Sequence, residues 1–406
     1  MKTRKPKIAI FTHNYLNTSK ERKDAGVFVY DYAQELAKHA DVSIFCPDFG
    51  GTKEEYKKVP VTWFDWGGPK TKFATWSFFS PTSVYNFFKL LIVGCKEAED
   101  FYKDNEVDYI LSAWVIPSAF YALWLNIKYK VPYGVWILGS DVNMYAKLPI
   151  LRQLTVLALR KATHRFANSY WLISVVENLS GKVCEYMDAI TKFDDISKVK
   201  AQKLNEKVFN FLFVSRLEKV KGPDVLIAAC KELKKNTNNF HLHSLGDGSM
   251  RKSLEEKVRQ WGLEKQITFH GVASKQQVAS FMKAADALVV ASRHESIPLV
   301  MVEASRAGLA TVTTDVGDCR IAIEKYDIGF VAKNEDPQDL AVAMNKAIQE
   351  GKNFNTNRAK GLQSLAKSRS QAKAVSILIT EVDKVITVTD KRNGKNGNRK
   401  IQKEKK

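Results

Sequence analysis

The sequence lacks the cysteine patterns that mark disulfide frameworks and zinc sites. Its 406 residues include five cysteines, with no Cys-x-x-Cys pair among them: Cys46, Cys95, Cys184, Cys230 and Cys319. Scattered cysteines of this kind fit a reducing compartment and argue against a disulfide-stapled fold. The seven histidines also show no metal-ligand spacing, so the sequence predicts no metal site.

Long hydrophobic runs are absent as well. The apolar run 8–11 follows a basic start, but it is too short for a signal peptide and indicates a first strand. The apolar-aromatic region 85–95 is interrupted by Lys89 and is shorter than a membrane span. We therefore expect the protein in the cytoplasm, with the inner membrane face as a site of peripheral contact.

The net charge is +19, and its distribution is uneven. Residues 391–406 carry eight Lys or Arg and one Glu, whereas residues 1–207 carry 29 basic and 22 acidic side chains. The tail has almost no apolar content and is expected to be disordered. A solubilising tail and a contact with an anionic membrane are equal alternatives for it. Nucleic acid is the least favoured partner, because no recognised binding motif accompanies the charge.

Apolar strands alternate with helices in two series, which is typical of parallel sheets covered by helices. The first series has expected strands at 7–12, 41–46, 109–113 and 133–138. The second has them at 209–214, 240–245, 267–269, 287–290 and 310–313. The Lys-rich stretch 192–207 lies between the series and marks a domain boundary. The predicted fold class is α/β, with two Rossmann-like, doubly wound domains facing a central cleft.

Two carboxylates, Glu295 and Glu303, lie eight residues apart after the expected strand 287–290. Glu303 stands in an otherwise apolar helix, where an ionised carboxylate is costly unless something hydrogen-bonds it. A sugar or ribose, rich in hydroxyl donors, would do so. The alternative is that Glu303 pairs with Arg306, while Glu295 is a solvated loop residue.

The residues between these carboxylates indicate the start of a helix. Ser296 is expected to be the N-cap, with Pro298 in the first turn. The free backbone N–H groups around Ile297 and Leu299 would then face the strand end, where helix N-termini bind anions such as diphosphate.

A basic loop follows the expected strand 209–214. It contains Arg216 and Lys221, and Gly222 and Pro223 then open a helix. Two cations at a strand end suit a nucleotide diphosphate, whose negative charge needs compensation. The alternative is a basic loop with no ligand, which is common.

These two motifs resemble elements of the family 4 (group 1) retaining glycosyltransferases, which have the GT-B fold. Residues 215–222 are similar to the element G-R-L-x-x-x-K-G, with Ser215 in place of the first glycine, and residues 295–303 to the element E-x7-E. The resemblance is continuous from Phe209 to about Ala347. It implies a first domain over 1–200, a nucleotide-sugar domain over 208–360, a helix over 361–388 that can return to the first domain, and the tail 389–406.

Two further positions of the second half fit the same family. Gly246 follows the strand 240–245 in a turn where backbone can approach a ligand closely, although Asp-Gly turns are common. His270 stands in the sequence Phe269-His270-Gly271, and in resembling enzymes this region lies near the nucleotide base. Both residues are therefore expected on the donor side.

The first half matches the family less closely. Gly26 lies at an expected helix start, where a phosphate-facing loop and a simple turn are equal alternatives. Gly139 and Asp141 correspond to a His-Gly-x-Asp element near the donor sugar. Leu138 replaces the histidine of that element, and no Asn-Gly-Val-Asp segment precedes the second half.

An aromatic cluster follows the second strand of the first half. Aromatic side chains stack on sugars and lie at membrane interfaces, but most of them belong to cores. We favour the core for this cluster and retain an acceptor-side or membrane-facing role as the alternative: Trp63, Phe64, Trp66, Phe73, Trp76, Phe78 and Phe79.

The resemblance implies a retaining transfer of sugar from a UDP- or GDP-linked donor to a glycan or lipid-linked acceptor in cell-surface polysaccharide synthesis. Arg216 and Lys221 would stabilise the departing diphosphate, Glu303 would hold the ribose, and Glu295 would support charge on the donor sugar. No cofactor other than the nucleotide sugar is expected. The departures at Leu138 and in the bridge favour the runner-up, a catalytically inactive nucleotide-sugar-binding or scaffold protein. A sugar-nucleotide epimerase is a third alternative.

Overall fold

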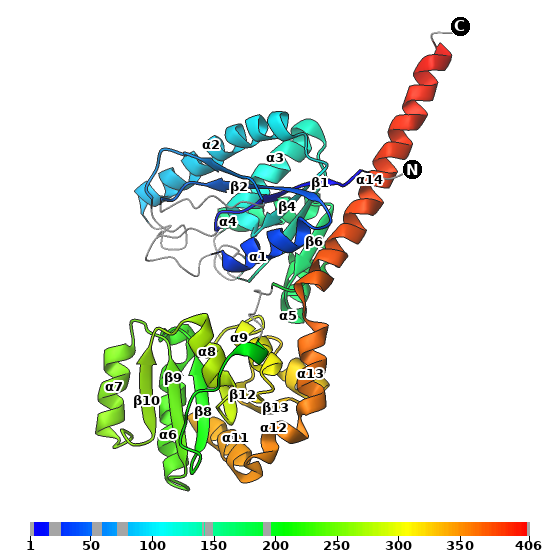
Figure 1. The fold of residues 1–406 in the computed structure, drawn as a ribbon. Helices are drawn as coiled ribbons and strands as arrows, with labels where there is room; N and C mark the ends of the chain where they lie inside the picture. The colour runs from blue at the N-terminus through cyan, green and yellow to red at the C-terminus, as the bar shows by residue number, and fades with distance from the viewer. Residues whose placement is uncertain are drawn as a thin grey trace. The chain divides into compact units, whose positions relative to one another are not determined.

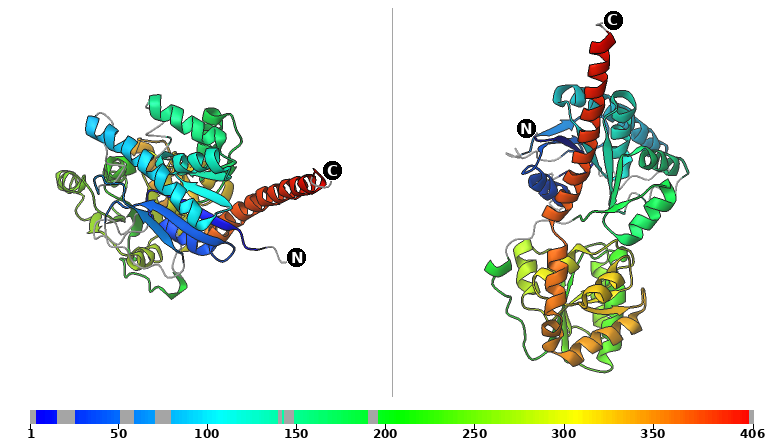
Figure 2. Two further views of the ribbon diagram at one scale, coloured as in Figure 1. Left: turned by 90° about the horizontal axis from the view of Figure 1, so that it is seen from above. Right: turned by 90° about the vertical axis from the view of Figure 1, so that its right-hand side faces the viewer.

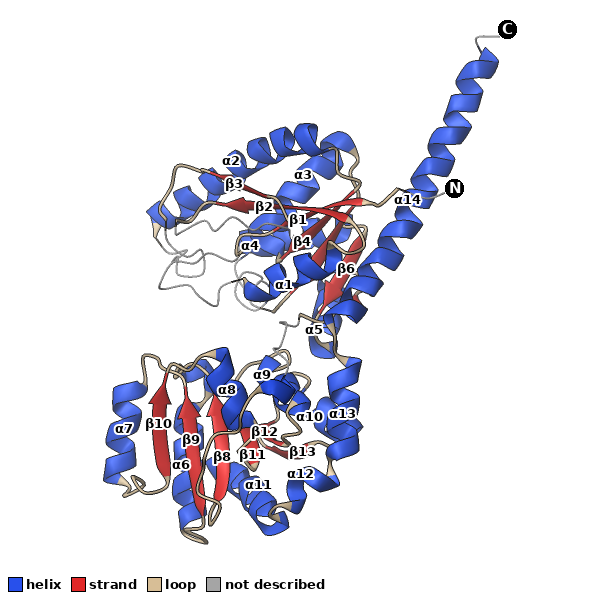
Figure 3. Ribbon diagram, viewed as in Figure 1, coloured by secondary structure: helices blue, strands red, loops and turns tan. Residues whose placement is uncertain are grey.

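The computed structural model describes residues 4–15, 26–50, 59–70, 80–139, 142, 149–189 and 196–403. The chain forms two compact units. The first contains Met1–Thr191 together with Gln371–Lys406, and the second contains Lys192–Ser370. Each unit is an α/β sandwich built on its own sheet (Figures 1 and 3).

The sheet of the first unit has seven strands in the order β3-β2-β1-β4-β5-β6-β7. All neighbouring pairs in it are parallel. The order reverses direction between β1 and β4, as in dinucleotide-binding folds. The strands are β1 (Lys7–Phe11), β2 (Asp41–Pro47), β3 (Val61–Phe64), β4 (Tyr109–Ala113), β5 (Tyr133–Ile137), β6 (His164–Ala167) and β7 (Glu185–Tyr186).

Helices cover both faces of this sheet. Ile8 and Ile10 of β1 share one core with α1 (Val27–Leu36) and α14 (Gln371–Lys403). Ala9 and Phe11 point to the other face and share a core with four helices. These are α2 (Pro81–Asn105), α3 (Phe120–Tyr129), α4 (Pro149–Lys161) and α5 (Tyr170–Ser180). Both faces of β1 are therefore buried, as its continuous apolar run predicts.

The second unit repeats this topology with six strands in the order β10-β9-β8-β11-β12-β13. Every pair is again parallel, and the order reverses between β8 and β11. The strands are β8 (Phe209–Val214), β9 (Phe240–Leu245), β10 (Ile267–Gly271), β11 (Ala287–Val290), β12 (Thr311–Thr314) and β13 (Gly329–Ala332).

Alternate residues of β8 point to the two faces of this second sheet. Phe209, Phe211 and Phe213 lie in the larger core. That core includes residues of α6 (Pro223–Lys234), α7 (Arg251–Gln260), α10 (Cys319–Tyr326), α11 (Pro337–Glu350), α12 (Asn353–Asn357) and α13 (Ala359–Ser368). Leu212 lies on the opposite face, which is covered by α8 (Lys275–Met282) and α9 (Leu299–Arg306).

The last helix, α14, returns to the first unit. Its ribbon runs along the first unit (Figure 2). The Tyr32 hydroxyl of α1 donates to the Ala374 carbonyl at 3.5 Å, and Val375 and Leu378 are fully buried. The structure continues α14 to Lys403, whereas the composition of 389–406 predicts disorder. Each residue added to a helix that is already nucleated gains a backbone hydrogen bond, so a packed first half favours continuation. Among the described residues, no helix is long and apolar enough to cross a membrane.

Candidate active site

The second sheet reverses its strand order between β8 and β11, and two loops leave the sheet there. Residues 215–222 follow β8, and residues 291–298 follow β11. In open α/β sheets, ligands bind outside the carboxyl ends of the strands at such a reversal point. The fold therefore brings the basic loop and the Glu295 loop together, although 74 positions separate Lys221 from Glu295.

Lys221 and Glu295 form an ion pair across these two loops. The Lys221 ammonium donates to Glu295 Oε1, and the Ser292 hydroxyl donates to the same oxygen at 3.1 Å. The side chains of Lys221 and Glu295 are 23% and 16% exposed. Glu295 is thus an oriented, half-buried carboxylate, and the alternative of a solvated loop residue is wrong.

Two glycines let the backbones of these loops approach closely. Gly222 has φ +63°, and a Cβ there would lie 1.8 Å from the Ala291 carbonyl oxygen. Gly246 has φ +136°, and a Cβ there would lie 1.9 Å from the Ser215 carbonyl oxygen. The close approach predicted at Gly246 is therefore made to the protein's own β8 loop. Both positions require glycine, because a side chain would displace main chain.

The two arginines of these loops have different environments. Arg216 is exposed, and among the residues that the structure describes its side chain has no hydrogen-bond or ion-pair partner, although its charge helps to lower the pKa of Glu218. Arg293, which the sequence did not single out, is 13% exposed and holds Asp224 with two hydrogen bonds of 2.7 and 2.9 Å. It also donates to the Lys219 carbonyl at 2.7 Å and to Glu335. Hydrogen bonding to Asp224 raises the pKa of Arg293, so Arg293 is a structural cation, whereas Arg216 is available to a ligand.

The predicted start of the helix after Glu295 is wrong by two residues. α9 begins at Leu299, its N-cap is Pro298, and no side chain caps it, so Ser296 is not the N-cap. The cause is Pro298, which disfavours helical backbone at the preceding Ile297. The Ile297 side chain is instead 7% exposed and belongs to the core. The Ser296 carbonyl accepts from the Asp318 N–H at 2.8 Å, which ties this loop to the one after β12.

Glu303 lies four residues after the start of α9, one turn into the helix instead of the expected two. Its side chain is half-buried, whereas its neighbours Val302 and Ala304 are fully buried. A side chain at this position tilts back toward the N-terminus of its helix. Arg306, the expected alternative partner of Glu303, donates to the Arg369 carbonyl at 3.0 Å.

His270 lies near the carboxyl end of β10, at the edge of the second sheet. Its exposed ring stacks on His243 of β9 at 5.4 Å and contacts Phe281 of α8 at 4.8 Å. The next residue, Gly271, accepts a hydrogen bond of 2.7 Å from the Gly246 N–H. The structure thus places His270 and Gly246 on neighbouring strand ends.

The first unit has its own set of residues at the carboxyl ends of its strands. Gly26 is the left-handed N-cap of α1, with φ 75°, and Gly139 follows β5 with φ 100°. Asp141 lies outside the described residues. Trp114, which follows β4, has φ 67° and ψ 155°, a conformation costly for a bulky residue and typical of functional sites. His13 stacks on it at 4.7 Å, and burial lowers the pKa of His13 to about 4.

No role was assigned to His13 or Trp114 from the sequence. The signal for both was their position directly after an apolar strand. Within the aromatic cluster, Phe64 and Trp66 are buried in the core, as favoured for the cluster, and Trp63 packs partly buried. The other four members lie outside the described residues.

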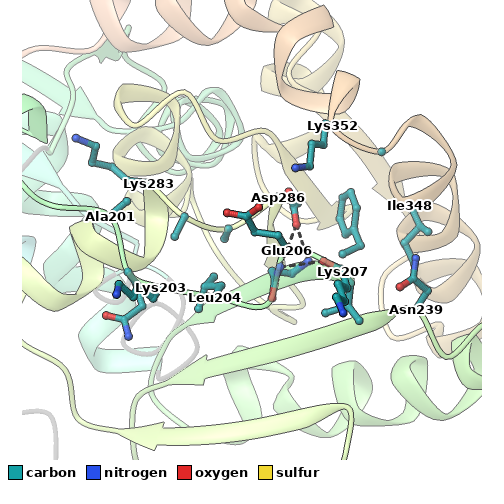
Figure 4. Close-up of a pocket in the computed structure, with 17 residues that line it drawn as sticks. Ala201, Lys203, Leu204, Glu206, Lys207, Asn239, Lys283, Asp286, Ile348 and Lys352 are labelled. Carbon is teal, nitrogen blue, oxygen red and sulfur yellow. Dashed lines mark hydrogen bonds between the residues drawn. The ribbon is translucent and has the colours of Figure 1, made fainter.

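A cavity of about 830 Å³ lies at the opposite end of the second sheet (Figure 4). It is lined by residues at the amino ends of β8, β9 and β11, among them Asn210, Asn239 and Asp286. Lysines at its rim are Lys203, Lys207, Lys283 and Lys352. Because the amino ends of parallel strands do not carry the ligands of doubly wound sheets, we place the candidate active site at the carboxyl ends.

A match to a known protein family lies within the second unit. Residues 194–363 match the family model described as glycosyl transferases group 1. An uncharacterized glycosyltransferase of Methanocaldococcus jannaschii is 28% identical over 254 residues, which are 62% of this chain and 68% of that protein. A D-inositol 3-phosphate glycosyltransferase of Corynebacterium aurimucosum is 32% identical over 144 residues, a third of each chain (34%).

Solved structures show the fold along almost the whole chain. Sucrose-phosphate synthase from Thermosynechococcus elongatus has a TM-score of 0.76 at 15% identity, covering 95% of this chain and all of that one. The Anabaena protein HepE in complex with UDP has a TM-score of 0.71 at 16% identity, covering 93% of this chain and all of that one. The chain therefore has the GT-B fold, and its residues 194–363 match the group 1 glycosyl transferases.

Proposed function

We propose that the protein is a retaining, family 4 glycosyltransferase that takes its sugar from a nucleotide-sugar donor. The observation that carries this proposal is the charge arrangement at the reversal point of the second sheet. The Arg216 side chain is exposed there, with no hydrogen-bond or ion-pair partner among the described residues, and Lys221 of the same loop is paired with Glu295. An anion with two phosphates suits this pair of cations. The group 1 match over residues 194–363 and the UDP complexes of HepE support the same donor class.

The residues are assigned roles by their positions. Arg216, Lys221 and the free N–H groups at the start of α9 would bind the diphosphate and stabilise it as it departs. Glu303, tilted toward the same end of α9, would accept hydrogen bonds from the ribose. Glu295 would face the donor sugar and stabilise positive charge at its anomeric carbon. Gly139 would let the backbone approach the donor closely, and Gly246 would allow the β8 loop with Arg216 to pack against the end of β9.

In the proposed reaction, the bond between the anomeric carbon and the phosphate oxygen breaks while the acceptor oxygen bonds the same face of that carbon. The acceptor proton moves to the departing phosphate oxygen, so no separate protein base is needed. Retention follows because departure and attack share one face. We propose a metal-independent reaction, in which Arg216 and Lys221 compensate the diphosphate charge.

The acceptor is proposed to be a glycan or a lipid-linked saccharide in cell-surface polysaccharide synthesis. One observation favours contact with an anionic membrane surface. Tyr85, Phe88 and Ile92, which share one side of α2, are 65%, 42% and 71% exposed, and Lys89 and Lys96 lie on the same helix. Apolar and cationic side chains in this arrangement suit the lipid interface.

Heat-unfolding shifts against a panel of nucleotide sugars and free nucleotides test this proposal. We expect a shift with UDP- or GDP-linked compounds that is lost in both Arg216→Ala and Glu303→Ala. A shift that persists in both variants would contradict the site. Binding without any transfer or donor hydrolysis would favour the second candidate, an inactive nucleotide-sugar-binding protein, which the presence of Leu138 in place of histidine supports.

A further inference from the structure

A chain of hydrogen bonds crosses the α8-covered face of the second sheet and ends at His270. His270 Nε2 lies 3.1 Å from His243 Nδ1, and His243 Nε2 lies 3.1 Å from Asn210 Oδ1. Asn210 is in turn bonded to Asp286, through its backbone N–H at 2.7 Å and its side-chain amide at 3.3 Å. The four residues come from β10, β9, β8 and the residue before β11, so the chain spans the sheet.

The orientation of the Asn210 amide is fixed by its surroundings. Its Nδ2 lies 3.0 Å from the carbonyl oxygens of Asn205 and Val208 and 3.3 Å from Asp286 Oδ2. All three neighbours accept hydrogen bonds and cannot donate them, so a rotated amide would place its oxygen against three oxygens. Oδ1 must therefore face His243, and it can only accept.

This orientation determines which ring nitrogens carry protons. His243 Nε2 must donate to Asn210 Oδ1. Burial, together with the nearby His241 and His270, lowers the pKa of His243 to about 4, so the ring is neutral at pH 7 and its Nδ1 is an acceptor. His270 Nε2 must then be the donor to that nitrogen. Burial, with His241 and Arg251 adding to it, also lowers the pKa of His270, so His270 is neutral and its Nδ1 holds a lone pair.

We propose that this chain holds His270 in the Nε2–H form, so that its Nδ1 accepts a hydrogen bond from a ring N–H of the donor's base. The ligand role rests on the proposed function, whereas the proton arrangement does not. Among the described residues, no group donates to His270 Nδ1, and the ring is exposed beside Gly271. Neighbouring strands lie about 4.8 Å apart, so β10 is roughly 10 Å from β8, within reach of a nucleoside whose diphosphate lies at Lys221.

A hydrogen-bond acceptor at His270 Nδ1 predicts which nucleotide bases bind preferentially. Uracil at N3 and guanine at N1 present a ring N–H, whereas cytosine at N3 and adenine at N1 present a lone pair. Asn210 and His243 act as positioning residues in this scheme, because they touch no ligand. His241 lies outside the chain: its Nδ1 is 3.1 Å from the Lys265 carbonyl and must donate to it, so its Nε2 accepts from Thr268.

Nitrogen-15 NMR of the histidine rings in the ligand-free protein at neutral pH tests the proton arrangement. We expect His243 and His270 in the Nε2–H form and His241 in the Nδ1–H form. An Nδ1–H form at His270 or His243 would overturn the chain, whatever the protein binds. Asn210→Leu should convert His270 to a mixture of both forms, while His241→Gln should leave it unchanged. Backbone NMR spectra of both variants would show that the fold persists.

Binding of UDP, GDP and ADP to wild type and His270→Phe tests the ligand role. A neutral hydrogen bond contributes about 0.5–1.5 kcal/mol, so we expect His270→Phe to weaken UDP and GDP about two- to tenfold and to leave ADP unchanged. Asn210→Leu should cause a smaller loss, and His241→Gln none. Equal losses of affinity for all three nucleotides in His270→Phe would overturn the role of His270 Nδ1 as a hydrogen-bond acceptor. If wild type binds none of them, the proposed donor site itself is wrong.

Discussion

The two arginines of the candidate site offer a direct test, because one is paired and the other is not. We consider the matched substitutions Arg216→Met and Arg293→Met, which remove the same charge and keep a long apolar side chain. The exposed Arg216 side chain has no hydrogen-bond or ion-pair partner among the described residues, so its loss should change the free energy of unfolding by less than about 0.5 kcal/mol. A hydrogen bond to a charged group contributes about 1.5–3 kcal/mol, so affinity for UDP or GDP should fall about ten- to a hundredfold.

Arg293→Met should instead cause a large loss of stability. Its loss removes the two bonds to Asp224 and the bonds to Lys219 and Glu335. Breaking a buried pair costs about 3–5 kcal/mol, and because Asp224 is 22% exposed we expect about 2–4 kcal/mol.

Urea unfolding measures stability in both variants, and titration calorimetry measures nucleotide affinity. The account is refuted if Arg216→Met binds the nucleotide as wild type does. It is also refuted if Arg216→Met is destabilised as strongly as Arg293→Met, because Arg216 would then be a structural cation.

Three further predictions concern the same unit. Gly222→Ala should destabilise the protein by more than about 2 kcal/mol, because the added Cβ would meet the main chain at Ala291. Gly308 has a similar φ but open space around it, so Gly308→Ala should cost about 1 kcal/mol. Equal losses of stability in urea unfolding would contradict this difference. A double-mutant cycle of Lys221→Met and Glu295→Gln should give a coupling of about 1–2 kcal/mol, and additive effects would argue against their pairing. The pKa of His243 is lower in the folded protein, at about 4, than in the unfolded chain. The stability that the neutral ring contributes is therefore fully present above pH 6.5 and is lost as the pH falls toward 4. Between pH 7.5 and 5 this loss should be about 2 kcal/mol, and His243→Gln should lack it.

Much of the architecture was readable from apolar runs. The strands at 109–113, 209–214, 240–245 and 287–290 have the predicted bounds, because each is a strong buried run with a clear start and end, and the helix predicted to open at Pro223 begins there. Short strands such as β6 and β13 were missed, since four residues with polar or small members give little periodicity.

The sequence indicated which charged residues form the site, but not which of them pair with one another. The sequence pointed to Arg216, Lys221 and Glu295, yet it did not show that Lys221 holds Glu295. It also passed over Arg293, because Asp224 and Glu335 are 69 and 42 positions away. Local patterns do not reveal contacts that tertiary packing creates. The misplaced start of α9 has a local cause, since the preference for Ser296 as a cap was outweighed by the effect of Pro298 on Ile297.

The central claim is that this site transfers sugar from a nucleotide donor with retention. The most direct measurement follows nucleoside diphosphate release from a panel of UDP- and GDP-sugars, with proton NMR of the sugar product at early times. We predict release from one donor family, an anomeric configuration equal to that of the donor, and a strong reduction in Arg216→Met. Inverted product, or release that is unchanged in Arg216→Met, would contradict the account.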